Sequence, residues 1–323
     1  MTNKPVQFLA ALGVIVGTSV VQAQTAYVSN EKDNTISVID INAAKVVDTI
    51  QVGQRPRGIL LSKDLKQLYI CTSDEDHIEV LDLDTLKVTH TLPSGTDPEL
   101  LALGGEGRLL YVANEDDNMV TVVDVVERRM IKEIAVGVEP EGMGISPDGK
   151  WLVNTSETTN MAHFINLETN LIEANVLVGA RPRVAQFTPD GNQVWVSAEI
   201  GGTISVIDVA SHRIVEEITF RLPGIERSAI QPVGLSITAD GKRVFVALGP
   251  AARVAVIDVE TYQVEKYLLV GQRVWNLDLT ADERYLVSTN GVSNDVSIID
   301  VNRLKVLKSI KVGRLPWGVV TKQ

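Results

Sequence analysis

A 42-residue repeat constrains the fold of this chain more than any other feature of its sequence. An Asp that follows Ile, Val or Leu recurs along the chain, and Asn fills one position of the series: Asp40, Asp82, Asp124, Asn166, Asp208, Asp258 and Asp300. Successive positions are 42 residues apart except for one step of 50. A period of about 40 to 50 residues is typical of chains built from copies of one supersecondary unit.

Each repeat contains four short apolar segments separated by turn residues. One segment is a tetrad such as Tyr-Val-Ser-Asn, which starts at Tyr27, Tyr69, Tyr111, Val153, Trp195, Phe245 and Val287. A second marker, Val-Gly-x-x-Pro-x-Gly, has its glycines at 53 and 58, 137 and 142, and 313 and 318. The segments are too short and too rich in β-branched residues for helices. We therefore predict an all-β, seven-bladed β-propeller with four antiparallel strands per blade.

The two ends of the repeat series predict how the ring closes. The last copy ends at Gln323, before its Asp-Gly turn would fall, and the first copy begins at its second segment with Tyr27. One blade then takes its innermost strand, Trp317 to Thr321, from the C-terminal end and its other three from the N-terminal end. Such an exchange protects strand edges. We predict a single propeller over residues 24–323, closed by a C-terminal strand that joins the N-terminal blade.

Residues 1–23 have the pattern of a secretory signal peptide. Lys4 precedes the apolar stretch Val6 to Val21, and Val-Gln-Ala at 21–23 is a small-residue cleavage pattern. The stretch is about 16 residues long, shorter than the roughly 20 residues of a membrane-spanning helix. We expect cleavage near Ala23 and, in a Gram-negative host, a periplasmic product without a membrane span. An uncleaved anchor is the alternative.

Composition excludes several classes of function. The chain has 30 Lys and Arg against 41 Asp and Glu, and no run of five basic residues, so it lacks the charge of a nucleic-acid-binding protein. Its one cysteine, Cys71, excludes an intrachain disulfide, a Cys-rich zinc site and a C-x-x-C-H haem attachment. That thiol lies in an apolar segment, where we predict it to be buried and unreactive.

Known catalytic motifs are missing as well. The sequence has no G-x-S-x-G elbow, no Walker loop and no H-E-x-x-H. The four histidines do not share one position within their repeats, so we predict no shared metal site: His77, His90, His163 and His212. Acidic runs such as 74–76 and 115–117 lack the alternating ligands of a calcium loop, and we interpret them as solvated turns.

The repeat motifs resemble those of the YVTN-repeat, WD40-like β-propeller family. The resemblance rests on Tyr-Val-Ser-Asn, Tyr-Val-Ala-Asn, Ile-Ser-Val-Ile-Asp, Val-Gly-x-x-Pro-x-Gly and Ser-Pro-Asp-Gly, and it covers the whole chain after residue 23. The exported, seven-repeat layout is similar to periplasmic propellers associated with PQQ-dependent alcohol catabolism. That resemblance implies PQQ as a candidate ligand and a quinoprotein dehydrogenase as a candidate partner. Haem d1 and quinoprotein subunits are also similar in architecture, but their haem-bearing extensions are missing here.

The loops that connect one blade to the next carry the candidate binding residues, because on one face of a propeller they enter the axial funnel. Two residues after each loop glycine, or at the aligned position, lie Arg55, Asp97, Glu139, Arg181, Gln231, Arg273 and Leu315. Four residues after it lie Arg57, Glu99, Glu141, Arg183, Val233, Trp275 and Trp317. Because the seventh unit neighbours the first, a basic and aromatic sector is expected to hold Arg273, Trp275, Arg314, Trp317, Arg55 and Arg57. An acidic sector is expected beside it. The candidate ligand- or partner-binding residues are the members of the basic sector together with Arg181 and Arg183.

Two interpretations of these residues stay open. In the structural interpretation, each Arg pairs with a carboxylate of a neighbouring blade and each Trp covers the axis. In the functional interpretation, the guanidinium groups and indoles together bind a planar anion. We predict a non-catalytic periplasmic binding or accessory protein that uses the funnel face to bind an anionic small molecule or a partner protein. The alternatives are a lactonase-like hydrolase and a surface or adhesion propeller. The 50-residue step places an insertion at about Arg221 to Ile230, which we expect at the funnel rim.

Overall fold

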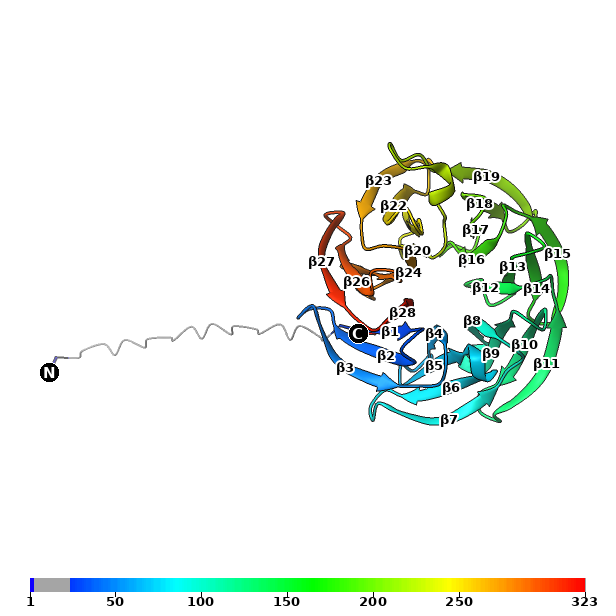
Figure 1. The fold of residues 1–323 in the computed structure, drawn as a ribbon. Coiled ribbons are helices and arrows are strands. Elements are labelled where there is room, and N and C mark those ends of the chain that lie inside the picture. The colour runs from blue at the N-terminus through cyan, green and yellow to red at the C-terminus, as the bar shows by residue number, and fades with distance from the viewer. Residues whose placement is uncertain (3–23, 323) are drawn as a thin grey trace.

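Seven four-stranded antiparallel sheets are arranged in a ring in the computed structural model, which describes residues 1–2 and 24–322 (Figure 1). The predicted seven-bladed β-propeller is confirmed. The predicted signal peptide, apart from its first two residues, and its cleavage site lie outside the described residues. No helix of the described part is long and apolar enough to cross a membrane.

Each blade runs from an innermost strand beside the axis to an outermost strand at the rim. Blade 1 contains β28 (Pro316–Lys322), β1 (Thr25–Asn30), β2 (Thr35–Asp40) and β3 (Lys45–Gln51). Blade 2 contains β4 (Pro56–Leu61), β5 (Gln67–Thr72), β6 (His77–Asp82) and β7 (Lys87–Pro93). Blade 3 contains β8 (Pro98–Gly104), β9 (Leu109–Asn114), β10 (Met119–Asp124) and β11 (Arg129–Ala135). Blade 4 contains β12 (Pro140–Ile145), β13 (Trp151–Ser156), β14 (Met161–Asn166) and β15 (Leu171–Leu177).

The remaining three blades follow the same order. Blade 5 contains β16 (Pro182–Phe187), β17 (Gln193–Ala198), β18 (Thr203–Asp208) and β19 (Arg213–Thr219). Blade 6 contains β20 (Leu235–Ile237), β21 (Arg243–Ala247), β22 (Arg253–Asp258) and β23 (Val264–Leu269). Blade 7 contains β24 (Val274–Leu279), β25 (Tyr285–Asn290), β26 (Asp295–Asp300) and β27 (Lys305–Lys311). Three single-turn 3-10 helices lie in loops: η1 (Ser73–Glu75), η2 (Gly105–Gly107) and η3 (Arg227–Ala229).

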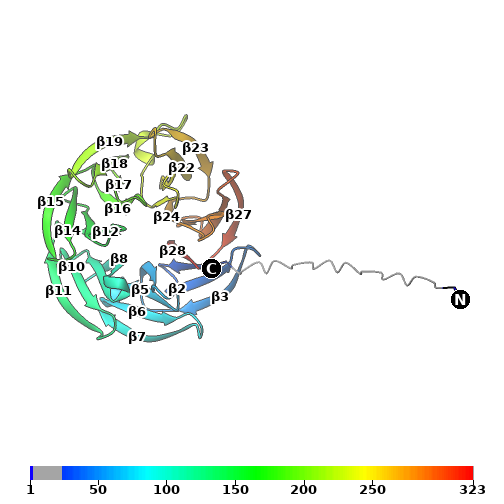
Figure 2. The same cartoon turned by 180° about the vertical axis from the view of Figure 1, so that it is seen from behind.

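Closure of the ring follows the predicted exchange between the two ends of the chain. The C-terminal strand β28 pairs antiparallel with β1, and Val28 lies opposite Val319. Both views of the ring place these strands at the same point of the circle (Figure 2). The Gly318 N–H donates to Ser29 Oγ at 2.9 Å, and Trp317 is 1% exposed. The C-terminal strand is therefore a fully packed element of blade 1.

The hydrophobic core is divided into seven clusters, one between each pair of adjacent blades. At the closure, Val28 and Ile39 of blade 1 pack against Val287 and Ile298 of blade 7. Middle strands contact a neighbouring blade on both faces, so their apolar runs are nearly continuous, as in β1, which is buried at five of its six positions. The outermost strands are polar and exposed, as in β3.

The Asp of each repeat has a structural role that explains its recurrence. Asp40 Oδ1 accepts a hydrogen bond from the Ala43 N–H at 2.8 Å, and Asp208 Oδ1 accepts one from the Ser211 N–H at the same distance. Side-chain acceptance within a turn in this way is a common role of Asp and Asn. These carboxylates therefore build the turns between the two outer strands.

Candidate functional site

One face of the ring, which we call the funnel face, carries the loops between successive blades. In six of these loops the residue two positions after the glycine has a positive φ of 51–57°: Arg55, Asp97, Glu139, Arg181, Arg273 and Leu315. Left-handed backbone is unfavourable for residues other than glycine, and such residues often occur at functional sites. In five of the six, a side-chain oxygen accepts a hydrogen bond from the backbone N–H of this residue. The Arg55 N–H, for example, donates to Asn34 Oδ1 with an N–O distance of 3.0 Å.

A layer of largely buried side chains closes the axis at the funnel end of the innermost strands. This neck layer consists of Arg57, Glu99, Glu141, Arg183, Val233, Trp275 and Trp317. Arg57 Nη2 lies 2.9 Å from Glu99 Oε2, and the Arg57 guanidinium stacks 4.7 Å from the centre of the Trp317 indole. The layer therefore places four charged side chains on one side of the axis and Val233 with two tryptophans on the other.

Arg183 is the most enclosed charge of the neck layer, with a side chain that is 3% exposed. Its Nη2 lies 2.9 Å from Glu141 Oε1, and its Nη1 pairs with Glu157 and lies 3.8 Å from Glu199 Oε2. A buried guanidinium requires such partners, because an unpaired charge is costly to remove from water. Burial nevertheless raises the pKa of Glu157 to about 8, although Arg183 and Arg181 oppose the shift.

The pKa values of two further carboxyls, Glu99 in the neck layer and Glu115 beside it, are shifted in the same direction. Burial raises the pKa of Glu99 well above its usual range, and the Glu141 carboxylate adds to the shift. Burial and Glu141 also raise the pKa of Glu115. The acidic side of the neck thus holds more carboxyl groups than its arginines neutralise.

Above the neck layer, Arg55 lies among four carboxylates. Its guanidinium is 3.0 Å from Asp97, 3.2 Å from Glu99, 3.4 Å from Asp74 and 3.9 Å from Glu31. The side chain is 25% exposed. It joins the funnel-face loops of blades 1, 2 and 3 through charge pairing.

Trp275 and the remaining funnel arginines form a second group over blades 5 to 7. The Arg273 guanidinium stacks 4.2 Å from the centre of the half-buried Trp275 indole, and its Nη2 lies 2.6 Å from Glu199 Oε1. Arg183 lies 5.8 Å from the same ring. Arg181 Nε lies 2.8 Å from Glu157 and 3.2 Å from Glu199. Glu199 therefore connects the three arginines of this group.

The structure brings the eight candidate residues together only in part. Arg55, Arg57 and Trp317 form one group, and Arg181, Arg183, Arg273 and Trp275 form another. Arg314 belongs to neither group, because its side chain is 69% exposed and pairs with Asp33 at 2.5 Å. All six arginines have carboxylate partners, as the structural interpretation of the sequence expected.

The carboxylates around these arginines were not predicted as site residues, and the run 115–117 was interpreted as a solvated turn, whereas Glu115 is half-buried beside Glu99. Glu31, Glu115, Glu157 and Glu199 each follow the second strand of a blade, and the last three are spaced by 42 residues. This spacing was the available signal. Spacing alone does not show that these carboxylates reach the arginines of the loops between blades.

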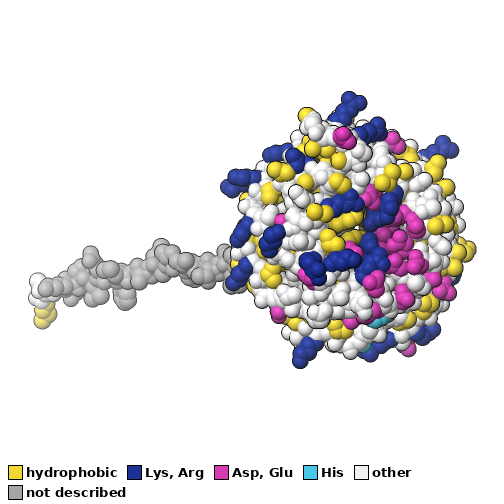
Figure 3. Space-filling model, in the orientation of Figure 1, with side chains coloured by type: hydrophobic (Ala, Val, Ile, Leu, Met, Phe, Trp, Pro, Cys, Tyr) yellow, Lys and Arg dark blue, Asp and Glu magenta, His cyan; other side chains and the backbone are white. Residues whose placement is uncertain are grey.

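Charges on the funnel face are strongly polarised. Acidic side chains gather on one side of the axis, and Lys and Arg occupy the centre and the other side (Figure 3). We call the acidic side the acidic crescent; it comprises Asp74, Glu75, Asp76, Asp97, Glu115, Asp116, Asp117 and Glu139, from the loops of blades 2 to 4. By contrast, residues 249–252 and 291–294, in the corresponding loops of blades 6 and 7, contain no charged residue.

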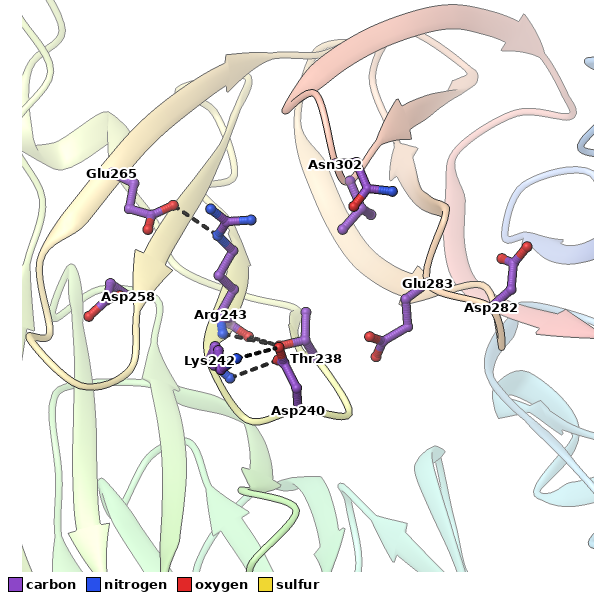
Figure 4. A pocket seen from close by; sticks show the side chains of 10 residues that line it. Thr238, Asp240, Lys242, Arg243, Asp258, Glu265, Asp282, Glu283 and Asn302 are labelled. Carbon is purple, nitrogen blue, oxygen red and sulfur yellow. Dashed lines mark hydrogen bonds and ion pairs between the residues drawn. The ribbon is translucent and has the colours of Figure 1, made fainter.

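Four hollows lie away from the axis within the described residues, and two of them bear on the sequence predictions or on charge. The predicted insertion forms a groove of about 590 Å³ beside blade 5, lined by Phe220, Arg221, Leu222, Ile225 and Arg227 among others. A cleft of about 410 Å³ lies between blades 6 and 7 on the opposite face (Figure 4). Its charged groups build turns and strand edges: Asp240 accepts from the Thr238 hydroxyl at 2.7 Å, and Arg243 pairs with Glu265 at 3.0 Å. That cleft therefore has a structural explanation.

Residues 63–173, about a third of the chain, match the family described as the cytochrome D1 heme domain. The match covers most of blades 2 to 4. No protein of curated function matches the sequence.

Several solved structures share the fold. Kuenenia stuttgartiensis hydrazine synthase superposes with a TM-score of 0.78 and 20% identity over 85% of this chain and 92% of that one. A 6-phosphogluconolactonase candidate from Bacteroides fragilis superposes with a TM-score of 0.80 and 18% identity over 95% of this chain and 99% of that one. Dihydro-heme d1 dehydrogenase NirN, solved with DHE, superposes with a TM-score of 0.70 and 16% identity over 92% of this chain and 74% of that one. Identities of this size establish the common propeller architecture alone.

Proposed function

We propose that this protein is a non-catalytic periplasmic accessory protein whose funnel face docks a partner protein through a basic patch on that partner. The acidic crescent is the observation that carries the proposal. Eight carboxyl side chains lie on the loops of blades 2 to 4, across the ring from the uncharged loops of blades 6 and 7. Complementary charge of this kind steers association and sets orientation. A quinoprotein dehydrogenase is the partner class that the family resemblance implies.

The pairing within the neck layer supports binding rather than catalysis. A general acid or base needs a proton-transfer atom within reach of a substrate. Here the buried carboxylate of Glu99 pairs with Arg57, and that of Glu141 pairs with the buried Arg183. The lactonase-like alternative, which the Bacteroides fragilis neighbour suggests, requires such a group to be free at the funnel surface.

Haem d1, which the family match and the NirN structure suggest, does not fit this funnel. Haem iron is held by an axial side chain such as His. Both ring nitrogens of His163 are engaged, by Asn175 at 2.6 Å and by the Gly137 N–H at 3.0 Å. His77 is the first residue of β6, the third strand from the axis, and lies beside Glu75 rather than over the axis. The blades that match the family also carry the acidic crescent, which repels haem carboxylates.

Docking is tested with decalysine as a basic probe and decaglutamate as its opposite in charge, using calorimetry at low and physiological salt. Asp74→Lys/Asp116→Lys reverses two exposed charges of the crescent. Each reversal removes one attraction and adds one repulsion, and at about 0.3–0.4 kcal/mol per interaction binding should weaken about tenfold. Glu216→Lys/Glu217→Lys makes the same change in net charge on the exposed outer strand β19. Equal weakening by both variants would refute a docking role for the crescent.

A planar anion at Trp275 is the second candidate, and one contact favours it. Trp275 is half-buried with Arg273 stacked at 4.2 Å, and Arg181 is 47% exposed nearby. Such a ligand would have to compete with Glu199 for these guanidinium groups. Titration of PQQ against tryptophan fluorescence should then saturate in the parent and not in Trp275→Phe. Trp151→Phe is the matched control, because Trp151 lies in blade 4 at the face opposite the funnel.

A further inference from the structure

The axis of the propeller contains a cavity beyond the neck layer, toward the face opposite the funnel. Its volume is about 400 Å³, within the range of about 300–1,000 Å³ that small-molecule sites occupy. Residues of the innermost strands of blades 2 to 7 line it, and Pro147 borders it in the turn after β12. It lies along the same inner strands as the neck layer but toward the opposite face, and we call it the axial cavity.

The walls of the axial cavity combine apolar and polar surface in similar amounts. The apolar side chains that line it include Leu60, Met143, Ile145, Phe187 and Leu277. Gly144 allows the close approach of two inner strands here, because a Cβ at this position would lie 2.4 Å from the Ala185 carbonyl oxygen. Such a surface suits the apolar body of a ligand rather than a hydrated ion.

Polar groups without protein partners lie on one side of this cavity. The Gln186 amide and the Ser236 hydroxyl line it, and neither side chain forms a hydrogen bond within the described residues. Asn276, by contrast, donates to the Trp317 carbonyl at 3.0 Å. Convergent polar groups in an otherwise apolar pocket are the usual means of orienting a small ligand.

Asp278 is the single charged side chain among the lining residues. Its Oδ2 accepts the Thr321 N–H at 2.6 Å and lies 2.9 Å from the Thr321 hydroxyl oxygen, which is also 2.8 Å from the Leu279 carbonyl. One hydroxyl proton cannot serve both acceptors, so the carboxylate is incompletely satisfied. The Leu279 backbone N–H also stabilises the carboxylate, but Asp278 has no ion-pair partner within the described residues. Burial of this group raises its pKa to about 7.

We propose that the axial cavity binds a small organic amine: an apolar body packed between the inner strands and one ammonium group paired with Asp278, with Gln186 and Ser236 as additional hydrogen-bond partners. The cation would compensate the one buried carboxylate, which has no basic side chain among its neighbours in the cavity wall. An anion is excluded by the same argument. This site is distinct from the funnel-face docking function and does not depend on it.

Calorimetric titration of the full chain with 2-phenylethylamine tests the proposal, with 2-phenylethanol and phenylacetate as ligands of nearly equal shape. The amine should bind about tenfold or more tightly than the alcohol, and phenylacetate should not bind. Asp278→Asn should lower the affinity for the amine about tenfold and leave that for the alcohol unchanged. Glu260→Gln, which removes an exposed carboxylate near the same face, should leave both affinities unchanged.

Three outcomes would overturn the proposal: phenylacetate binding as tightly as the amine, undiminished amine binding by Asp278→Asn, or an equal loss in Glu260→Gln. Gln186→Leu provides a second variant in case Asp278→Asn alters the fold. It keeps the charge and removes one hydrogen-bond partner, so it should weaken the alcohol and the amine by the same factor of about three to ten. Far-ultraviolet circular dichroism of every variant confirms that the propeller is retained.

Discussion

Replacement of Asp278 by Asn should make the protein more stable at alkaline pH. The pKa of this carboxyl rises from an ordinary 3.8 to about 7 in the folded protein, and burial is the largest cause. The folded state therefore binds more protons than the unfolded state between these two values, so stability falls as pH rises from about 4 to about 7. At about 1.4 kcal/mol per pH unit, the loss has an upper limit of about 4 kcal/mol.

Asn cannot ionise, so the variant avoids this loss. Its amide oxygen can still accept the Thr321 N–H, and its NH₂ can donate to the Thr321 hydroxyl, as a protonated carboxyl would. We expect the variant to be more stable than the parent by about 2–4 kcal/mol at pH 8 and nearly equal to it at pH 4. Glu99, Glu115 and Glu157 add a similar pH dependence to both proteins, which cancels in the difference.

Urea unfolding followed by circular dichroism at pH 4, 5, 6, 7 and 8 measures this difference. Asp258→Asn is the opposite control, because hydrogen bonds from Thr261 lower the pKa of Asp258. Removing that carboxylate should destabilise the protein at neutral pH and progressively less toward low pH. A difference between parent and Asp278→Asn that stays constant from pH 4 to pH 8 would refute the reasoning.

Four further predictions concern closure, the neck layer, the insertion and export. Deletion of residues 317–323 removes the inner strand of blade 1, so the thermal midpoint should fall steeply or the protein should aggregate; an unchanged midpoint would contradict the role of β28. Arg183→Met leaves Glu141 with no ion-pair partner and should cost about 3–5 kcal/mol in urea unfolding, whereas Arg314→Met at the rim should cost less than about 1 kcal/mol. Excision of 222–229 should preserve the circular dichroism spectrum and alter decalysine or PQQ binding; unchanged binding would leave the insertion without a role. N-terminal sequencing of periplasmic protein should begin near Gln24, and intact cytosolic protein would contradict export.

The fold could be predicted from the sequence because the same turn-forming residues recur at a fixed spacing. The Asp at the end of each third strand caps a turn, and the offset between the first and last copies identifies Trp317 as part of the closing strand. These signals depend on short-range spacing, which a sequence displays directly. The insertion near Arg221 was located for the same reason.

The candidate site could be predicted only in outline. Alignment of the loops placed Arg57 beside Trp317, since the last repeat neighbours the first in a closed ring, and Arg273 beside Trp275, since they are two residues apart. It could not show that Arg183 would point among carboxylates from three blades, because that depends on how far each side chain reaches across the axis. The axial cavity was equally inaccessible, since its volume is set by the packing of six inner strands rather than by any motif.

Closure by β28 and β1 also determines how slowly this propeller is expected to fold. The hydrogen bond from Gly318 to Ser29 joins residues 289 positions apart, whereas pairing within the other six blades is local. Contacts of such long range form late, because the entropy of the intervening chain must be lost first. Until then β1 presents an unpaired edge, so a population of open rings prone to edge-to-edge association should precede the native state. Kinetic partitioning between closure and aggregation, more than final stability, should therefore set the yield of refolding.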